Sequence, residues 1–271
     1  MERMPAETIT SARNPKIRGL LELQQKPSER RRTGLFTVEG RRELGHCLSA
    51  GFKPDSVFFC PEILGDGDES RRLTAAFPES RRFRVTREVY SRIAYREGTE
   101  GIIAEIRMKD NSLESLSLPE RPLVLVTEDV EKPGNLGAML RTCDAAGADA
   151  LIACGHKTDL YNPNLIRASI GAVFTVPCAA CSSEEAIGFL HGKGIRILTA
   201  QLQDSSPYYD CDMRGGTAIV MGTEDKGLGE AWRSAADAHI RIPMLGRLDS
   251  LNVSVSAAIL LYEAVRQRQV R

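Results

Sequence analysis

The chain has 271 residues, enough for two domains of ordinary size or one large one, and its hydrophobic content of 42% is sufficient for a packed core. Lys and Arg balance Asp and Glu at 36 each, so the net charge indicates no particular partner. No apolar run approaches the roughly 18–20 residues of a membrane span, and the first seven residues lack the apolar core of a signal peptide. We therefore expect no membrane association.

Cysteine usage favours a cytoplasmic protein. The seven cysteines are odd in number, and most lie in apolar surroundings, which is typical of buried free thiols in a reducing compartment. Cys178 and Cys181 have the spacing of metal ligands, but no second pair and no histidine cluster completes a site. We expect no bound metal.

Up to residue 108 the sequence predicts a small α/β domain, because short apolar strands alternate with helices. A turn at Asn14-Pro15 opens the first helix, and a basic irregular stretch over residues 26–32 follows it. Further helices are expected over 41–49, 69–76 and 88–94, and strands over 35–38, 56–60, 83–85 and 102–107.

Basic side chains gather in this first part of the chain. Residues 1–121 include 22 basic and 19 acidic residues, against 14 and 17 in the remainder. Nine of the basic residues fall between Arg13 and Arg42, which indicates a polyanion-binding surface, although a solvated helix face has the same pattern. The candidate contacts are Arg13, Lys16, Arg30, Arg31, Arg32 and Arg41.

A polar, serine-rich and aperiodic stretch over residues 109–121 predicts a linker. In residues 122–271, apolar strands and helices alternate more cleanly, which predicts a parallel sheet covered on both faces. Ligands of such sheets bind at the carboxyl ends of the strands. Strands are expected over 123–127, 150–153, 173–176, 195–200, 217–221 and 239–244, and helices over 135–147, 161–168, 183–192, 228–236 and 252–268.

The loop after the 123–127 strand contains a Pro133-Gly134 turn and Asn135, which is a plausible N-cap of the next helix. On that helix, Arg141 projects roughly 150° from the centre of the apolar stripe, at about 100° per residue. A solvated surface residue would occupy the same position, so this loop alone indicates no function.

Two further loops follow predicted strands. Residues 222–229 include three glycines, which let a backbone approach a ligand closely, but they lack the spacing of a phosphate-binding or dinucleotide loop. After the last strand, the chain enters an apolar helix that nevertheless opens with Ser250 and Asn252. Burying such groups without hydrogen bonds costs roughly 1–3 kcal/mol each. This turn is therefore either a capped helix start or the wall of a small-molecule site.

Together, segments 135–142 (NLGAMLRT), 221–228 (MGTEDKGL) and 242–254 (IPMLGRLDSLNVS) resemble the three signature motifs of the SpoU family in identity, order and spacing. This family comprises RNA 2′-O-ribose methyltransferases of the SPOUT superfamily. The resemblance covers about residues 122–268. More loosely, residues 14–17 and 36–42 resemble the ribosomal-protein-like RNA-binding domain that many members carry.

The resemblance implies a parallel α/β sheet whose C-terminal part forms a deep trefoil knot and binds S-adenosylmethionine there. The general rule that chains avoid knots would have excluded this fold. Family members are homodimers with the last helix in the interface, which suits a helix that is apolar on most sides. Matched residue by residue, the cofactor contacts would be Gly222, Thr223, Ile242, Met244, Leu251 and Asn252.

The positions that match the family's catalytic residues are Arg141, Asn135, Glu224, Ser250 and Asn252. Methyl transfer requires the ribose hydroxyl to be held in line with the methyl group and to lose its proton. The family model assigns this activation to the arginine, supplied by the partner subunit. Because a guanidinium with a pKa above about 12 is a poor base, our hypothesis is that Arg141 orients the adjacent phosphate and stabilises the developing alkoxide.

The substrate implied by the resemblance is a folded RNA. A 2′-hydroxyl target excludes DNA, and the basic N-terminal side chains would contact phosphates. An N-terminal domain of this type favours ribosomal RNA over transfer RNA, which remains the alternative. Lys132 stands where many members have an aspartate, so the carboxylate usually near the substrate is missing.

Two functions of other classes stay open. One is a non-catalytic RNA-binding factor for ribosome assembly, against which the intact Asn135, Arg141 and Glu224 count. The other is a dinucleotide-dependent enzyme, against which the missing glycine fingerprint and ribose-binding acid count.

Overall fold

The computed structural model describes residues 7–95, 100–130, 132–155, 159–223, 225–247 and 250–269. The chain forms two compact units. The first runs to Lys109 and also includes Tyr161–Phe174, whereas the second holds Asp110–Leu160 and the residues from Thr175 onward. The segment 161–174, which the sequence analysis places in the second domain, thus belongs to the first unit. Within the described ranges, none of the helices has the length and apolar character needed to span a bilayer.

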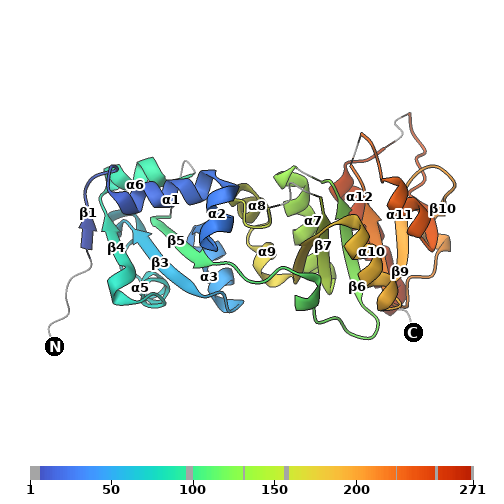
Figure 1. Ribbon diagram of the computed structural model, residues 1–271, viewed down its shortest axis with the longest axis horizontal. Coiled ribbons are helices and arrows are strands. Elements are labelled where there is room, and N and C mark those ends of the chain that lie inside the picture. The colour runs from blue at the N-terminus through green and yellow to red at the C-terminus, as the bar shows by residue number, and fades with distance from the viewer. Residues whose placement is uncertain are drawn as a thin grey trace. The chain divides into compact units, whose positions relative to one another are not determined.

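The first unit is built on a mixed five-stranded sheet in the order β1-β4-β3-β5-β2. Strand β5 (Ile102–Arg107) pairs antiparallel with the edge strand β2 (Leu35–Glu39) and with the central strand β3 (Pro54–Phe59). Strand β4 (Arg82–Val85) pairs parallel with β3 and with β1 (Glu7–Ile9). Its helices are α1 (Pro15–Gln25), α2 (Pro27–Thr33), α3 (Arg41–Ser49), α4 (Pro61–Leu64), α5 (Asp68–Ala75), α6 (Arg87–Ile93), α8 (Pro163–Ala168) and α9 (Ala172–Thr175) (Figure 1).

The start of α1 follows from its sequence. The Asn14 side chain accepts a hydrogen bond from the backbone N–H of Lys16, and Pro15 occupies the first helical position, where its missing N–H is no loss. The stretch over 26–32, predicted to be irregular, is instead helix α2. It also begins with a proline and ends at Gly34, which has a φ of 66°.

Aromatic packing determines the conformation of segment 161–174. The Tyr161 ring stacks on Phe36 with 4.4 Å between centroids, and Phe174 meets Phe52 edge-on at 5.2 Å. The strand predicted over 173–176 is therefore wrong: its β-branched and aromatic residues form α9, and the strand β8 (Cys178–Cys181) follows it. Tertiary packing overrides local β-propensity here.

The second unit confirms the predicted parallel sheet. Seven strands lie in the order β10-β12-β9-β11-β6-β7-β8, and every neighbouring pair is parallel. Besides β8, the strands are β6 (Leu123–Glu128), β7 (Ala150–Cys154), β9 (Arg196–Ala200), β10 (Ser206–Pro207), β11 (Thr217–Met221) and β12 (Ala238–Arg241). The helices are α7 (Pro133–Ala146), α10 (Ser183–Gly192), α11 (Glu230–Ala235) and α12 (Val253–Gln269).

Helices cover this sheet in two layers. Helices α10 and α11 pack together over β7 and β9, with the fully buried Trp232 in their core, and α12 packs on α7, β6 and β11 (Figure 1). The stretch predicted to be a linker adds to the first of these cores: Leu113 is buried in it, and Asn111 accepts a hydrogen bond from the backbone N–H of Ala180 at 2.9 Å. This stretch contains the short 3₁₀ helix Leu113–Ser115, and its residues from Asp110 onward belong to the second unit.

Candidate functional site

A cavity of about 310 Å³ opens at the carboxyl ends of the neighbouring strands β12, β9 and β11. Its volume is within the range of about 300–1,000 Å³ that is usual for small-molecule sites. The carboxyl edge of a parallel sheet is also where a ligand is expected. Among the described residues, the wall includes 200–203 after β9, 221–223 and 225–228 after β11, Arg233 of α11, 240–242 and 244 at the end of β12, and Ser250, Leu251, Val253, Ser256 and Leu260 around the start of α12.

Most of the predicted cofactor contacts line this cavity: Gly222, Thr223, Ile242, Met244 and Leu251. Ser250, predicted to be catalytic, lines it as well. Asn252 does not. Its side-chain oxygen accepts a hydrogen bond from the backbone N–H of Ser254 at 3.0 Å, so it caps α12 as its residue type predicts. The predicted catalytic residue Glu224 lies outside the described residues.

The loop after β11 folds back on itself. Thr223 and Gly227 exchange two backbone hydrogen bonds of 3.2 and 3.0 Å. A Cβ atom at Gly222 would lie 2.3 Å from the carbonyl group of Gly227, so only glycine fits there. The neighbour that requires glycine at position 222 is thus the loop's own backbone, and a close approach of this backbone to a ligand stays a prediction.

A chain of hydrogen bonds fixes the far end of this loop. Glu128, the last residue of β6, accepts from the backbone N–H of Gly229 at 2.6 Å and, with its other oxygen, from the Ser183 hydroxyl at 3.0 Å. Ser183 in turn accepts from the indole N–H of Trp232 at 2.9 Å. The carboxylate therefore joins β6, α10 and α11 to the loop that lines the cavity. The sequence does not single out Glu128, because its partners lie 55 and 101 residues away.

The end of β9 supplies cavity residues that the sequence also does not reveal, because only the strand order brings β9 between β12 and β11. Gln201 donates a side-chain hydrogen bond to the Gln203 carbonyl at 2.9 Å, which fixes the orientation of its carboxamide. Its buried oxygen is left without a partner among the described residues.

Helix α7 carries the remaining predicted catalytic residues outside the cavity wall. It begins at Pro133 with Lys132 as its N-cap, so the predicted cap at Asn135 is wrong and Asn135 lies in the first turn. The Asn135 side-chain oxygen accepts a hydrogen bond from the Asn252 amide at 3.2 Å, which connects α7 to the start of α12. Arg141 is exposed, and the part of the chain that the structure describes offers it neither a hydrogen bond nor an ion pair.

One predicted RNA contact in the first unit is wrong. Arg30 is only 1% exposed, and its guanidinium donates hydrogen bonds to the carbonyls of Leu23 and Gln24 at 2.5 and 3.1 Å. It joins the end of α1 to α2, because a buried guanidinium must be fully hydrogen-bonded. It is not available to a polyanion.

The other predicted RNA contacts differ in their exposure and in whether their side chains already have a partner. Arg13 and Arg31 are exposed. Lys16 pairs with Glu7 at 2.8 Å and Arg32 with Glu29 at 2.5 Å, both on the surface, where such pairs contribute little and exchange readily. Arg41 is half-buried and donates to the Leu64 carbonyl at 2.5 Å.

The cysteines of β8 cannot share a ligand. They are three residues apart on a strand, so their side chains point to opposite faces of the sheet. Cys181 lies beside its strand neighbour Cys154, and the hydrogen bond between them raises the pKa of Cys154 and lowers that of Cys181. Within the described ranges, no group of three or more His, Cys, Asp or Glu side chains is arranged to hold a metal ion.

A parallel sheet with a cavity walled by segments 221–228 and 242–254, and with helix 133–146 connected to that wall, defines a methyltransferase of the SPOUT class. Residues 122–262 match the SpoU rRNA Methylase family, to which this chain belongs. Residues 14–104 match the MRM3-like substrate binding domain.

Three proteins of known function or structure match over 95% or more of their own length. The 23S rRNA (guanosine-2′-O-)-methyltransferase RlmB of Vibrio cholerae serotype O1 is 33% identical over 234 residues, which cover 82% of this chain and 95% of that protein. A solved RNA 2′-O ribose methyltransferase is 37% identical with a TM-score of 0.82, covering 97% and 100% of the two chains. An AdoMet-bound rRNA methyltransferase from Sinorhizobium meliloti is 29% identical with a TM-score of 0.86, covering 96% and 98%.

Proposed function

We propose that the protein transfers the methyl group of S-adenosylmethionine to a ribose 2′-hydroxyl of ribosomal RNA. The observation that carries this proposal is the cavity at the carboxyl edge of the second sheet, which Gly222, Ile242 and Leu251 line together. Relatives of similar length are named for this reaction on 23S rRNA, and one was solved with AdoMet bound. The matched substrate-binding domain supports an RNA substrate.

The cavity has the groups that an adenosine-containing cofactor needs. Leu202, Ile242 and Leu251 line the cavity with partly or well exposed side chains, which offer an apolar surface to a base. When bound, S-adenosylmethionine supplies a methyl group made electrophilic by the adjacent sulfonium. The protein's part is to exclude water and to hold the ribose hydroxyl in line with that methyl.

Arg141 acts, in our proposal, on the substrate bound to a second copy of the chain. Its exposure, its position outside the cavity wall and its lack of partners among the described residues support this role. The guanidinium would orient a phosphate and stabilise the developing alkoxide. Ser250 at the cavity wall, together with Glu224 and Asn135, would position the reacting nucleotide, whereas Asn252 would hold α7 against α12.

The homodimer that this role requires would form through α12. Val255 and Tyr262 are 47% and 49% exposed and lie two helical turns apart on one face, which is a suitable surface for a symmetric contact. We also propose the trefoil knot of the family for the C-terminal part of the chain and a cytoplasmic location, which the free described cysteines support.

The test is methyl transfer from radiolabelled S-adenosylmethionine to ribosomal RNA isolated from a host that lacks this protein. We expect one ribose to acquire a 2′-O-methyl group, detected as a stop in primer extension at low nucleotide concentration. Incorporation into transfer RNA alone would refute the ribosomal substrate. Binding of S-adenosylhomocysteine without transfer to any RNA would refute the enzyme and favour an assembly factor.

A further inference from the structure

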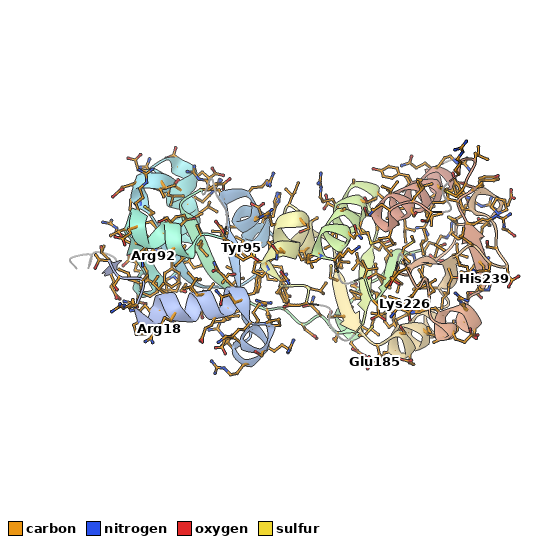
Figure 2. All side chains as sticks on the ribbon, turned by 90° about the horizontal axis from the view of Figure 1, so that it is seen from above. Arg18, Arg92, Tyr95, Glu185, Lys226 and His239 are labelled. Atoms are coloured by element: carbon orange, nitrogen blue, oxygen red, sulfur yellow. The ribbon has the colours of Figure 1, made fainter. Side chains whose placement is uncertain are left out.

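Tyr95 has an unusual position in the first unit. Among the described residues of that unit, it is the only large apolar or aromatic side chain that is well exposed, at 42%. Figure 2 labels Tyr95. Its backbone N–H donates to a carboxylate oxygen of Glu39 at 2.9 Å, and its phenol oxygen accepts from the side-chain amide of Asn164 at 2.9 Å. Because both ends of the residue are held, a ligand that stacks on the ring orders little that is not already ordered.

A cationic residue borders the same small hollow as this ring. Arg167 is three residues after Asn164 on α8, so the two side chains share one face of that helix. Arg167 is exposed, and no described residue forms a hydrogen bond or ion pair with its guanidinium. Both Tyr95 and Arg167 border a small hollow that Gln24, Thr37, Glu39, Pro163 and Ile166 complete.

The hollow is small and polar on one side. Its volume is about 20 Å³, which is room for about one water-sized group. Glu39 brings a carboxylate to its wall, and a carboxylate accepts hydrogen bonds from amino groups. An exocyclic amine of a nucleobase has the size and the donor character for this position.

An exposed aromatic ring beside an arginine is how proteins hold an unpaired nucleotide of RNA, with the base on the ring and the phosphate on the cation. We propose that Tyr95 and Arg167 form a binding site for one unpaired nucleotide of the RNA substrate. The base stacks on Tyr95 with its exocyclic amine toward Glu39, and a flanking phosphate pairs with Arg167. This inference rests on the proposed function. It adds a defined RNA contact to the first unit, where the predicted contact Arg30 is buried and Lys16 and Arg32 have acidic partners.

The test uses the full-length protein and a ten-nucleotide single-stranded RNA that contains 2-aminopurine, whose fluorescence falls when it stacks. We expect Tyr95→Ala to weaken binding about tenfold or more and to remove the quenching, because base–aromatic stacking is lost. Tyr95→Phe keeps the ring and should keep both. Arg167→Ala should lower the slope of log affinity against log salt concentration by about one, as expected for one lost phosphate contact.

Matched controls separate this site from nonspecific effects. Tyr209→Ala removes an exposed tyrosine of the second unit, and Arg72→Ala removes an exposed arginine of α5, and neither should change the quenching or the salt slope. Melting temperature and S-adenosylhomocysteine affinity check that Tyr95→Ala is folded. Quenching that persists in a folded Tyr95→Ala variant overturns the inference.

The outcome is distinguishable from failure of the proposed function. If the wild-type protein methylates ribosomal RNA and both site variants have an unchanged KM for it, the nucleotide site is wrong and the enzyme stands. If RNA binding depends on Tyr95 and Arg167 but no RNA is methylated, the site stands and the proposed reaction is wrong.

Discussion

Arg141 and the cavity lie on different parts of the second unit, and this separation allows cofactor binding and catalysis to be tested independently. The guanidinium is exposed and outside the cavity wall. We expect Arg141→Ala to lower kcat at least about a hundredfold, as when a donor to a developing oxyanion is removed, while S-adenosylhomocysteine binds as tightly as before by calorimetry. Arg141→Lys keeps the charge without the fork of donors and should recover part of the rate. Normal turnover of the alanine variant would show that the residue is not catalytic.

Glu128 allows the loop after β11 to be perturbed from outside the cavity. Removing its carboxylate in Glu128→Ala leaves the backbone N–H of Gly229 and the hydroxyl of Ser183 without their acceptor. A hydrogen bond to a charged group contributes about 1.5–3 kcal/mol, so we expect S-adenosylhomocysteine affinity to fall about tenfold or more, measured by calorimetry.

Glu128→Gln and Glu184→Ala are the controls for this effect. The glutamine keeps a carbonyl oxygen that can accept from Gly229, so affinity should largely return. Glu184 is an exposed glutamate on the same helix as Ser183, and its removal should leave affinity unchanged. If all three variants bind alike, the loop does not depend on this carboxylate.

The sequence predicts the role of a single residue only when the residues that determine this role are close to it along the chain. Gly222, Ile242 and Leu251 are predictable because each stands in a short contiguous motif, and the resemblance of these motifs to the SpoU family implies their role. Gln201 and Glu128 are not, because their roles arise only when strand order brings distant segments together. The prediction that Arg30 contacts RNA is wrong. A run of basic residues does not show which guanidinium is exposed and which one donates hydrogen bonds to buried carbonyls.

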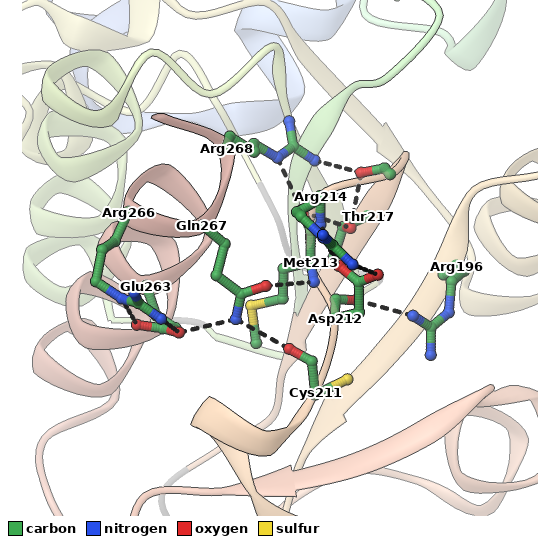
Figure 3. A network of polar contacts seen from close by, with 11 residues as sticks. Arg196, Cys211, Asp212, Met213, Arg214, Thr217, Glu263, Arg266, Gln267 and Arg268 are labelled. Atoms are coloured by element: carbon green, nitrogen blue, oxygen red, sulfur yellow. Dashed lines mark hydrogen bonds and ion pairs between the residues drawn. The ribbon is translucent and has the colours of Figure 1, made fainter. Parts of the chain in front are cut away.

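Among the elements, α12 is fixed at both of its ends. It starts at the cavity and ends beside the residues that precede β6 and β11. There, Gln267 accepts from the backbone N–H of Met213 at 2.8 Å and donates to the Cys211 carbonyl at 3.0 Å (Figure 3). Partial burial lowers the pKa of Arg268, whose guanidinium donates to four backbone carbonyls, those of Arg121, Pro122, Met213 and Gly215.

This anchor predicts a stability effect at the end of the chain. Arg268→Ala removes the guanidinium from four carbonyls, so we expect the free energy of unfolding to fall by about 2 kcal/mol. Arg214→Ala is the comparison, because Arg214 pairs with the exposed Asp212, and surface pairs contribute about 0–1 kcal/mol. Urea unfolding followed by circular dichroism measures both. Equal midpoints for the two variants would mean that the anchor contributes nothing.

Elements were predicted well where one physical signal dominates. Helices α3 and α10 and strands β5 and β11 have the predicted bounds, because period and flanking residues agree there. Two predictions failed where tertiary contacts decide. Residues 173–176 look like a strand but pack as part of α9, and the basic stretch over 26–32 is helical because Arg30 binds carbonyls at the end of α1.

For the whole molecule, the class of fold was predictable and the division into units was not. Alternating apolar strands and helices predict the parallel sheet of the second unit. The sequence of segment 161–174 does not predict its packing on Phe36 and Phe52, because these aromatic residues lie more than a hundred residues earlier in the chain. The trefoil knot stays a prediction from the family resemblance.

A dimer that shares its active sites predicts complementation between two inactive variants. Arg141→Ala retains an intact cavity, whereas Gly222→Val cannot form the loop after β11, because a side chain there overlaps the Gly227 carbonyl. Each variant alone should be inactive. The two variants are combined in equal amounts, unfolded together and then refolded. Half of the dimers then contain one copy of each variant, and each such dimer has one complete site, with the cavity of one copy and Arg141 of the other.

We therefore expect the refolded mixture to recover about a quarter of wild-type methyl transfer, since one site in four is complete. If Arg141 instead serves the cavity of its own copy, every site in the mixed dimer lacks either the arginine or the loop, and no activity returns. Adding Val255→Asp to both variants places a charge on the exposed stripe of α12 and should abolish recovery by preventing association. Light scattering during gel filtration would then report a single copy. A sample that stays dimeric and active with Val255→Asp would exclude α12 as the interface. A refolded mixture without Val255→Asp that is dimeric but inactive would exclude the partner's arginine as the catalytic group.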